Sequence, residues 1–332
     1  MTDGPPRGMN GWSMPAFMPI VLITVVLFAV SAVVAPGTVS RSGIDSTLPF
    51  AGILAIAAVG QAIVVMMGGI DLSLPGMMTL AAMVTSQFAA DNGDNIWLAL
   101  AVVAAIAVVS GAINGVLVVV FEVTPLIATL AMNAGLLGAA FAYSGGTPTS
   151  APDGLTDFAL AKTLGVSHTV WVAVAVVAIT AFLVGQTVWG RRLIAVGTNR
   201  RAARTSGLRW RSVSIGGYVL AALCYSAAGV VLAGFVSSPG TTAGNPYLLP
   251  SIAAVVVGGT PLIGGKGTII GASVGAIFFT QLRQLVFALG APSSSQLLVQ
   301  ALVIGVAATL QVRGSGVSRR LAEIMPVKLR SG

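Results

Sequence analysis

A carboxylate inside an otherwise apolar stretch is the first residue that could do chemistry. Asp71 and Ser73 lie in residues 68–76, which read Gly-Gly-Ile-Asp-Leu-Ser-Leu-Pro-Gly. Two glycines can end a helix through a positive φ angle, Asp71 or Ser73 can accept hydrogen bonds from the N–H groups of the next helix, and Pro75 suits its first turn. A carboxylate at the centre of a bilayer costs about 2.5–3.5 kcal/mol on insertion scales, so Asp71 should lie near an interface, line an aqueous path or be paired. The stretch is therefore either a capped cytoplasmic turn or a break that lines a solute path.

Amide and hydroxyl side chains recur in two further apolar stretches. Asn114 precedes a glycine in one, and Thr129 and Asn133 lie four residues apart in the next, where a helix would place them on one face. Such groups either hold neighbouring helices together or offer hydrogen bonds to a polar solute. The candidate residues of a translocation path are Asp71, Ser73, Asn114, Thr129 and Asn133.

Residues 190–211 form the longest strongly basic segment. Asn199 can cap a short helix that begins at Arg200, and Gly207 can end it. Ala202 and Ala203 would give this helix a smooth patch between arginines. The segment is either a basic loop that fixes orientation or a coupling helix that docks on a soluble partner through small residues and arginines. The candidate coupling residues are Asn199, Arg200, Arg201, Ala202, Ala203, Arg204 and Gly207.

The glycine-rich residues 258–268 resemble a phosphate loop only superficially. That loop needs serine or threonine after its lysine, whereas Gly267 follows Lys266, and no strand precedes the stretch. A tight turn between helices explains it. The single cysteine, Cys224, and the single histidine, His168, have no partners of a metal site, and no catalytic constellation is present. We expect this chain to be no enzyme and to bind no cofactor or metal.

The composition indicates a membrane protein. Hydrophobic residues make up 56% of the 332 residues and charged residues 8%, against roughly 25% charged in a soluble domain, so most of the surface must face lipid. Lipid offers no hydrogen-bond partners to a bare backbone, so the long apolar runs must be helical. We predict an all-α integral membrane protein with about ten transmembrane helices, at 16–36, 48–67, 73–90, 96–121, 125–143, 170–189, 213–236, 250–264, 268–289 and 296–312. The polar residues 144–167 could hold a short surface helix.

Lysine and arginine predict the orientation. If both termini are cytoplasmic, fourteen of these residues lie in cytoplasmic segments, and only Arg41 and Lys162 lie outside, with Arg283 inside a span. The formal net charge of +8 is thus explained by basic cytoplasmic segments that fix the orientation in the membrane, and no nucleic-acid partner is needed to explain it. We predict one transmembrane domain over residues 1–332, with a cytoplasmic tail at 1–15, a cytoplasmic coupling loop at 190–211 and a basic cytoplasmic tail at 313–332.

Taken together, these stretches resemble the permeases of ribose-type ABC sugar importers, a family that also serves xylose and galactosides. The resemblance rests on residues 68–73, on Asn114-Gly115 with 125–130, on 197–207, and on 258–267, in this order over nearly the whole chain. Two places depart from the family pattern. The coupling loop lacks the usual proline and acid after Asn199, and Arg283-Gln284 stands where the family often has Asn-Gly.

The resemblance implies a multi-pass permease of the bacterial inner membrane that works as a dimer with a second copy or a paralogue. A cytoplasmic ABC ATPase would bind ATP and Mg²⁺, and a periplasmic or lipoprotein binding protein would deliver the sugar. An ion- or proton-coupled secondary transporter is the alternative; it would bury carboxylates within its helices, whereas Asp71 and Glu122 fall near predicted helix ends. The span interiors offer few aromatic faces for a sugar, so we expect the permease alone to bind its solute weakly.

Overall fold

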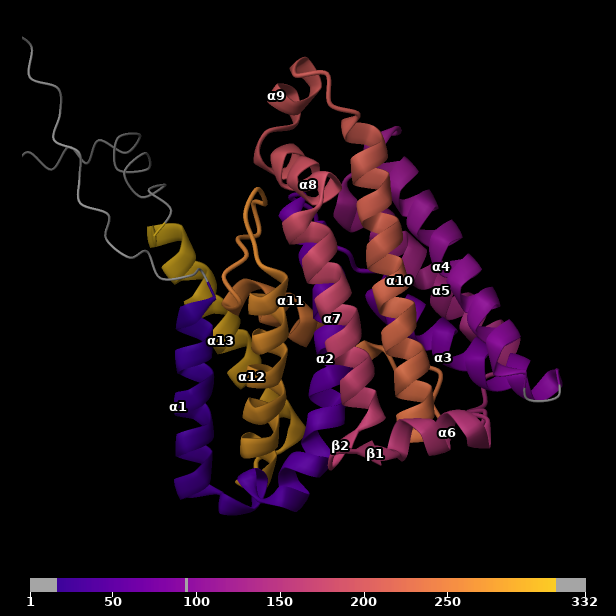
Figure 1. The fold of residues 1–332 in the computed structure, drawn as a ribbon, viewed down its shortest axis with the longest axis vertical. Coiled ribbons are helices and arrows are strands. Elements are labelled where there is room, and N and C mark those ends of the chain that lie inside the picture. The colour runs from indigo at the N-terminus through magenta and orange to yellow at the C-terminus, as the bar shows by residue number, and fades with distance from the viewer. Residues whose placement is uncertain (1–16, 93–94, 315–332) are drawn as a thin grey trace, which may run out of the picture.

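The structure is a computed structural model that describes residues 17–92 and 95–314. The predicted tail at 1–15 and residues 315–332 of the basic tail lie outside these residues. Figure 1 shows a bundle of helices with one small hairpin of strands. The elements are α1 (Met18–Val34), η1 (Pro36–Val39), α2 (Arg41–Met66), α3 (Leu74–Asp91), α4 (Ile96–Val119), α5 (Pro125–Ser144), α6 (Asp153–Leu160), β1 (Lys162–Thr163), β2 (Val166–Ser167), α7 (His168–Gln186), α8 (Val188–Thr198), α9 (Arg200–Thr205), α10 (Trp210–Val236), η2 (Asn245–Tyr247), α11 (Leu248–Val257), α12 (Ile269–Ala288) and α13 (Ser293–Gly314).

Each of the ten predicted stretches contains a helix, and the short surface helix expected in 144–167 is α6. Among the described helices, six are long and apolar enough to cross a membrane, namely α2, α4, α5, α7, α10 and α12. The strands β1 and β2 are antiparallel, with Lys162 opposite Ser167. The fold is therefore all-α apart from this hairpin.

Two predicted boundaries are wrong for local reasons. Helix α11 ends at Val257 instead of 264, because the chain turns at Gly259 with φ 91° and residues 258–268 then form a loop. Helix α2 begins at Arg41 instead of 48, because the Ser40 Oγ accepts the N–H of Gly43 and caps an additional polar turn. A hydropathy pattern does not mark helical turns that extend beyond the apolar run.

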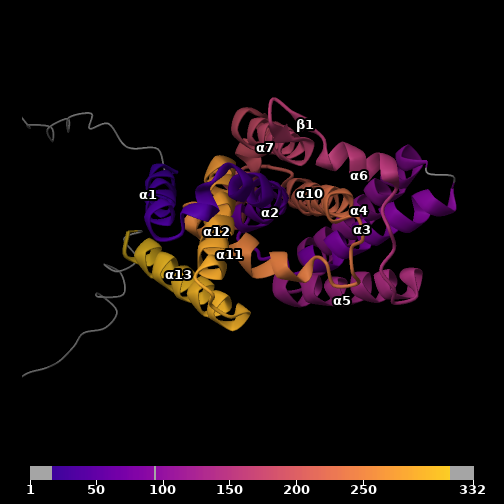
Figure 2. The same cartoon turned by 90° about the horizontal axis from the view of Figure 1, so that it is seen from below.

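Helix α2 is the central element of the bundle. From residue 51 to its end every side chain is buried, and it packs against α7, α10, α11 and α12 (Figure 2). The outer helices α1, α7 and α13 instead expose large apolar side chains, for example Val33, Phe182 and Leu298. Large apolar side chains on the outer helices suit a bundle surrounded by lipid.

The loops gather at two opposite ends of the bundle (Figure 1). At the α9 end lie α8, α9 and the loop 258–268. At the α6 end lie α6, the strand hairpin and the turn between α1 and α2, where the Nζ of Lys162 lies 2.7 Å from the Oδ2 of Asp45. The arginines of residues 190–211 and Lys266 therefore lie at the α9 end, and Lys162 and Arg41 lie at the α6 end.

Candidate functional site

After α2 the chain turns back into the bundle as an irregular segment, residues 67–73, here called the Asp71 segment. Gly68 adopts φ 79°, and Asp71 then lies beside Gln61. The Gln61 amide, oriented with its nitrogen toward the Tyr225 hydroxyl (3.1 Å), donates to the carbonyl of Asp71 at 3.0 Å and accepts its N–H at 3.2 Å. Gln61 precedes the end of α2 by five residues, so Asp71 lies about 7–8 Å below that end. This is a break inside the bundle, as in one of the two readings of the sequence.

The carboxylate of Asp71 is held by hydrogen bonds without a cation. It is 1% exposed, and its Oδ1 accepts the backbone N–H of Ser73 at 2.8 Å and the Ser73 hydroxyl at 2.6 Å. The amide of Asn114 in α4 donates to the same hydroxyl at 3.1 Å. Among the described residues, no lysine or arginine lies within salt-bridge distance of Asp71. The expectation that a buried Asp71 would have a partner is met by Ser73.

Side chains of helix α5 accept hydrogen bonds from backbone N–H groups at the start of α3. The Thr129 hydroxyl accepts the N–H of Leu72 at 2.9 Å, and the Asn133 Oδ1 accepts the N–H of Gly76 at 2.8 Å. The four-residue spacing of Thr129 and Asn133 matches the spacing of the two donors, so one face of α5 follows the start of α3. Ser73 is the N-cap residue and its side chain makes no capping bond, whereas the Asp71 Oδ1 accepts the N–H of Ser73, so of the two residues expected to accept N–H groups at the start of this helix only Asp71 does so. All five path candidates nevertheless belong to one hydrogen-bonded cluster.

A second irregular segment enters from the α6 end. Residues 237–247, here called the Thr242 segment, join α10 to α11 and reach the first turns of α3, where the Gly244 N–H donates to the Thr79 hydroxyl at 3.0 Å. Gly229 of α10 also lies against Met78 of α3, seven residues before α10 ends, so the segment reaches about 10 Å into the bundle. Irregular backbone at that depth must be buried in protein or line water.

Several polar side chains of the Thr242 segment have no partner among the described residues. Ser238, Thr242 and Asn245 are exposed and make no side-chain hydrogen bond. The sequence analysis missed this segment because Ser-Ser-Pro-Gly-Thr-Thr-Ala-Gly-Asn-Pro between two apolar runs is typical of an ordinary surface loop. Nothing in the sequence indicates that it lies against α3. Two irregular segments, one from each end, thus meet at the start of the same helix.

The basic segment contains two helices at the α9 end. The Asn199 Oδ1 accepts the N–H of Ala202 at 3.0 Å, and Gly207 adopts φ 71°, so the predicted cap and stop of the short helix are confirmed. The predicted patch of two alanines is wrong, because Ala203 is 3% exposed and packs inward while Ala202 faces outward. Adjacent residues of a helix point about 100° apart, so both cannot face one partner.

Helix α8, the loop 258–268 and the end of α2 contact one another. The Gly265 N–H donates to the carbonyl of Met66 at 2.9 Å, and the Thr198 hydroxyl donates to the carbonyl of Gly265 at 3.2 Å. Gly197 lies so close to the Met66 carbonyl that a Cβ there would overlap it. The basic segment is therefore in direct contact with Met66, the last residue of α2, which directly precedes the Asp71 segment.

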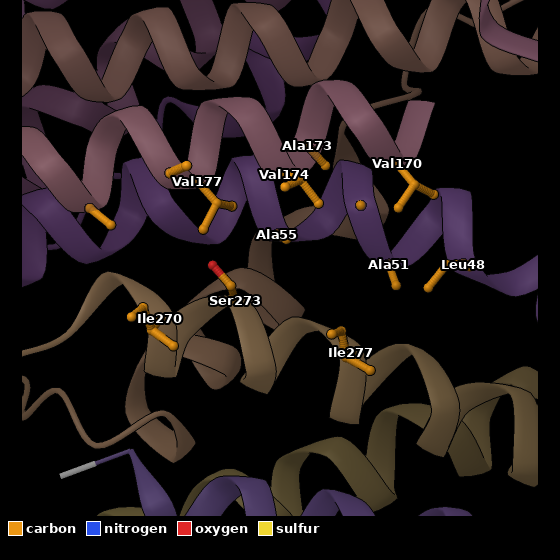
Figure 3. A pocket seen from close by; sticks show the side chains of 13 residues that line it. Leu48, Ala51, Ala55, Val170, Ala173, Val174, Val177, Ile270, Ser273 and Ile277 are labelled. Atoms are coloured by element: carbon orange, nitrogen blue, oxygen red, sulfur yellow. The ribbon is translucent and has the colours of Figure 1, made fainter. Parts of the chain in front are cut away.

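The groove shown in Figure 3 lies elsewhere, between α2, α7 and α12. It encloses about 370 Å³, and its lining carries one polar side chain, Ser273, whose hydroxyl donates to the carbonyl of Ile269. Such a lining offers nothing to a polar solute. Within residues 17–92 and 95–314 no three histidine, cysteine, aspartate or glutamate side chains are grouped as metal ligands would be.

Comparisons with known proteins agree on one class. The model of a family described as "Branched-chain amino acid transport system / permease component" matches residues 43–308. The chain is 34% identical to the ribose import permease protein RbsC of Escherichia coli K12 over 89% of this chain and 92% of that protein. It is 30% identical to the fructose import permease protein FrcC of Rhizobium meliloti (80% and 76%) and 31% identical to the L-arabinose ABC transporter permease protein AraH of Azospirillum brasilense (89% and 88%). No solved structure gives a significant match.

Proposed function

Because this chain belongs to the family of transport-system permease components, we propose that it imports a sugar along a path formed by the Asp71 and Thr242 segments. The chain is the multi-pass inner-membrane permease of an ABC importer and not an enzyme, which removes the secondary-transport alternative. Such an importer includes a separate ATPase and a binding protein. The observation that carries the proposal is the contact of α8 and the loop 258–268 with Met66, the residue that directly precedes the Asp71 segment.

The solute class is a sugar rather than a branched-chain amino acid. The family description names the amino acids, whereas the three permeases compared above carry the names of ribose, fructose and L-arabinose. The exposed hydroxyl and amide groups of the Thr242 segment also suit a solute rimmed with hydroxyls. Uptake of ribose, fructose, L-arabinose and leucine should be measured in proteoliposomes that hold the permease, its ATPase and its binding protein. Uptake of leucine and of none of the sugars would contradict this proposal.

The two segments have different roles in the proposed path. Asp71, Ser73, Asn114 and Thr129, which are buried, and the half-buried Asn133 form its scaffold, and the groups of the Thr242 segment contact the solute. Because most polar atoms of the scaffold already bond to one another or to the backbone of residues 72–76, the permease should hold a sugar weakly, and the binding protein should choose it. Calorimetry of the purified permease with the transported sugar tests this statement. Micromolar binding without the binding protein would place the recognition site in this chain.

We place the α9 end in the cytoplasm, with ten crossings and both termini inside, in a single permease domain. The concentration of arginines at that end supports this orientation, because cytoplasmic segments of membrane proteins are enriched in lysine and arginine. Reporter fusions after Asp153 should report an outside location and fusions after Arg204 an inside one. Reaction of an introduced cysteine with a membrane-impermeant reagent gives a second readout with little background, since Cys224 is buried. An outside location at Arg204 would contradict the orientation.

Residues 190–211 are the proposed contact with the ATPase, and α9 is its centre. ATP and Mg²⁺ bind that subunit, and this chain holds no cofactor. Ala202 faces outward, so Ala202→Trp should leave the protein folded but weaken ATPase binding and separate hydrolysis from uptake. Ala203→Trp is the comparison, since its buried position should make it lower the stability of the permease itself. If Ala202→Trp binds the ATPase and transports as the wild type does, the contact lies elsewhere.

The assembly is proposed to contain a second permease, either a copy of this chain or a paralogue. Light scattering of the detergent-solubilised transporter, with the ATPase and without it, measures the number of permease chains. A single permease chain in the complete transporter would exclude this arrangement.

A further inference from the structure

A cavity of about 370 Å³ at the α9 end combines charge with apolar walls. It lies between the α4–α5 turn, α9 and the start of α10. Its lining includes three arginines, Arg200, Arg201 and Arg204, and one carboxylate, Glu122. None of these four side chains takes part in an ion pair or a side-chain hydrogen bond with another described residue. The formal charge of these groups is +2, so the cavity favours an anion.

The surroundings of the cavity place it at the level of lipid headgroups. Trp210 is part of the lining and half-buried, and tryptophan concentrates where the membrane meets water. Beside it, Phe121 and Ile127 in and after the α4–α5 turn are 68% and 64% exposed. Apolar side chains this exposed suit contact with acyl chains, so an amphipathic ligand of the cavity would find an apolar surface close to the charged lining.

We propose that this cavity binds the headgroup of an anionic phospholipid, a role separate from transport of the sugar. The guanidinium groups of Arg200 and Arg204 would hold the phosphate through charge-assisted hydrogen bonds, for which the planar fork of arginine is suited. Glu122 accepts a hydrogen bond from a hydroxyl of the headgroup, and the acyl chains lie along Phe121 and Ile127. Basic pockets between helices on the cytoplasmic side are typical sites for acidic lipid headgroups.

A soluble protein fits the cavity less well than a lipid. An acidic loop of the ATPase could meet the arginines, but it would leave Phe121 and Ile127 uncovered or press its polar surface against them. A lipid can contact both regions at once, because its charged headgroup would meet the arginines while its acyl chains cover Phe121 and Ile127. The ATPase then contacts the outward face of α9 at Ala202.

The test is native mass spectrometry of the full-length permease released from nanodiscs of equal parts phosphatidylglycerol and phosphatidylcholine. The wild type should retain about one phosphatidylglycerol per chain in preference to phosphatidylcholine. In Arg200→Gln/Arg204→Gln the retained phosphatidylglycerol should fall at least fivefold. The matched control, Arg191→Gln/Arg192→Gln, removes the same charge from the same segment outside the cavity and should retain the lipid as the wild type does.

A charge-preserving variant guards against misfolding. Arg200→Lys/Arg204→Lys should retain more phosphatidylglycerol than the glutamine variant and less than the wild type. Equal retention by the glutamine variant and its control would overturn the proposal. So would an unchanged lipid count with a selective loss of ATPase binding, which would assign the arginines to the protein partner. Lipid retention is measured without the ATPase, so its failure is distinct from a failure of transport.

Discussion

The two irregular segments that meet at the start of α3 differ in how their polar groups are used. In the Asp71 segment, the backbone of Asp71 bonds to Gln61, its carboxylate bonds to Ser73, and the next N–H bonds to Thr129. In the Thr242 segment, the hydrogen bonds come mostly from the segment's own backbone, for example from the Gly244 N–H to the Thr79 hydroxyl, and the side chains of Thr242 and Asn245 are exposed. Both segments leave helical geometry inside the bundle. The polar groups of the Asp71 segment are hydrogen-bonded within the protein, whereas the side chains of Thr242 and Asn245 are exposed.

The difference indicates that the Asp71 segment has a structural role and that the Thr242 segment contacts the solute. The buried polar groups of the Asp71 segment are hydrogen-bonded and rigidify their surroundings, although the Oδ1 of the neighbouring Asn114 has no partner among the described residues. Exposed hydroxyl and amide groups are instead free to exchange water for a solute. The Asp71 segment is also connected to α8 through Met66, so we expect it to move as a unit when the α9 end moves. Substitutions in the first segment should therefore affect stability and transport together, and substitutions in the second should affect solute handling alone.

The largest effect is expected for Gln61→Leu. This change leaves the buried N–H and carbonyl of Asp71 without partners, which should lower the free energy of unfolding by about 2–6 kcal/mol, at roughly 1–3 kcal/mol for each unsatisfied group. Uptake should fall below a tenth of the wild-type rate. The midpoint of unfolding in a detergent titration measures the first quantity. Gln284→Leu is the matched control, because that half-buried amide makes no hydrogen bond to a described residue and its loss should cost little.

A smaller effect is expected for Thr129→Val. It removes the acceptor of the Leu72 N–H and should lower the free energy of unfolding by about 1–2 kcal/mol and slow uptake several-fold. Thr280→Val is the comparison, since the buried Thr280 hydroxyl bonds only within its own helix, to the carbonyl of Ala276. If both valine variants lose the same stability and the same uptake, the hydrogen bond between α5 and the Asp71 segment contributes no more than one within a helix.

The smallest effect on stability is expected in the Thr242 segment. Thr242→Ala and Asn245→Ala should each change the free energy of unfolding by less than about 0.5 kcal/mol, since the side chains are exposed and unbonded. Uptake should nevertheless need a several-fold higher concentration of sugar-loaded binding protein at half-maximal rate, while the maximal rate changes little. A stability loss as large as that of Thr129→Val would show that the two segments do not differ as described.

Sequence reasoning predicted the helices and the path candidates but not how they meet. Asp71, Thr129 and Asn133 stand out because polar residues are rare in apolar runs, and their spacing is visible in the sequence. The depth of the Asp71 segment depends on Gln61, whose amide looks like any other polar residue of a long helix until the chain folds back beside it. The inward packing of Ala203 and the contact of Gly197 with Met66 are likewise set by tertiary structure, which no local pattern encodes.

The central claim is that the ATPase acts on the path through α8, Met66 and the Asp71 segment. Gly197→Val tests it most directly, because a side chain there must displace the Met66 carbonyl. Gly185→Val is the control, since a Cβ at that glycine of α7 meets nothing within 4 Å. Sugar uptake and ATP hydrolysis should be measured together in proteoliposomes with the ATPase and the binding protein. The account predicts that Gly197→Val keeps hydrolysing ATP but loses at least nine-tenths of its uptake while Gly185→Val keeps both; normal uptake by Gly197→Val would contradict it.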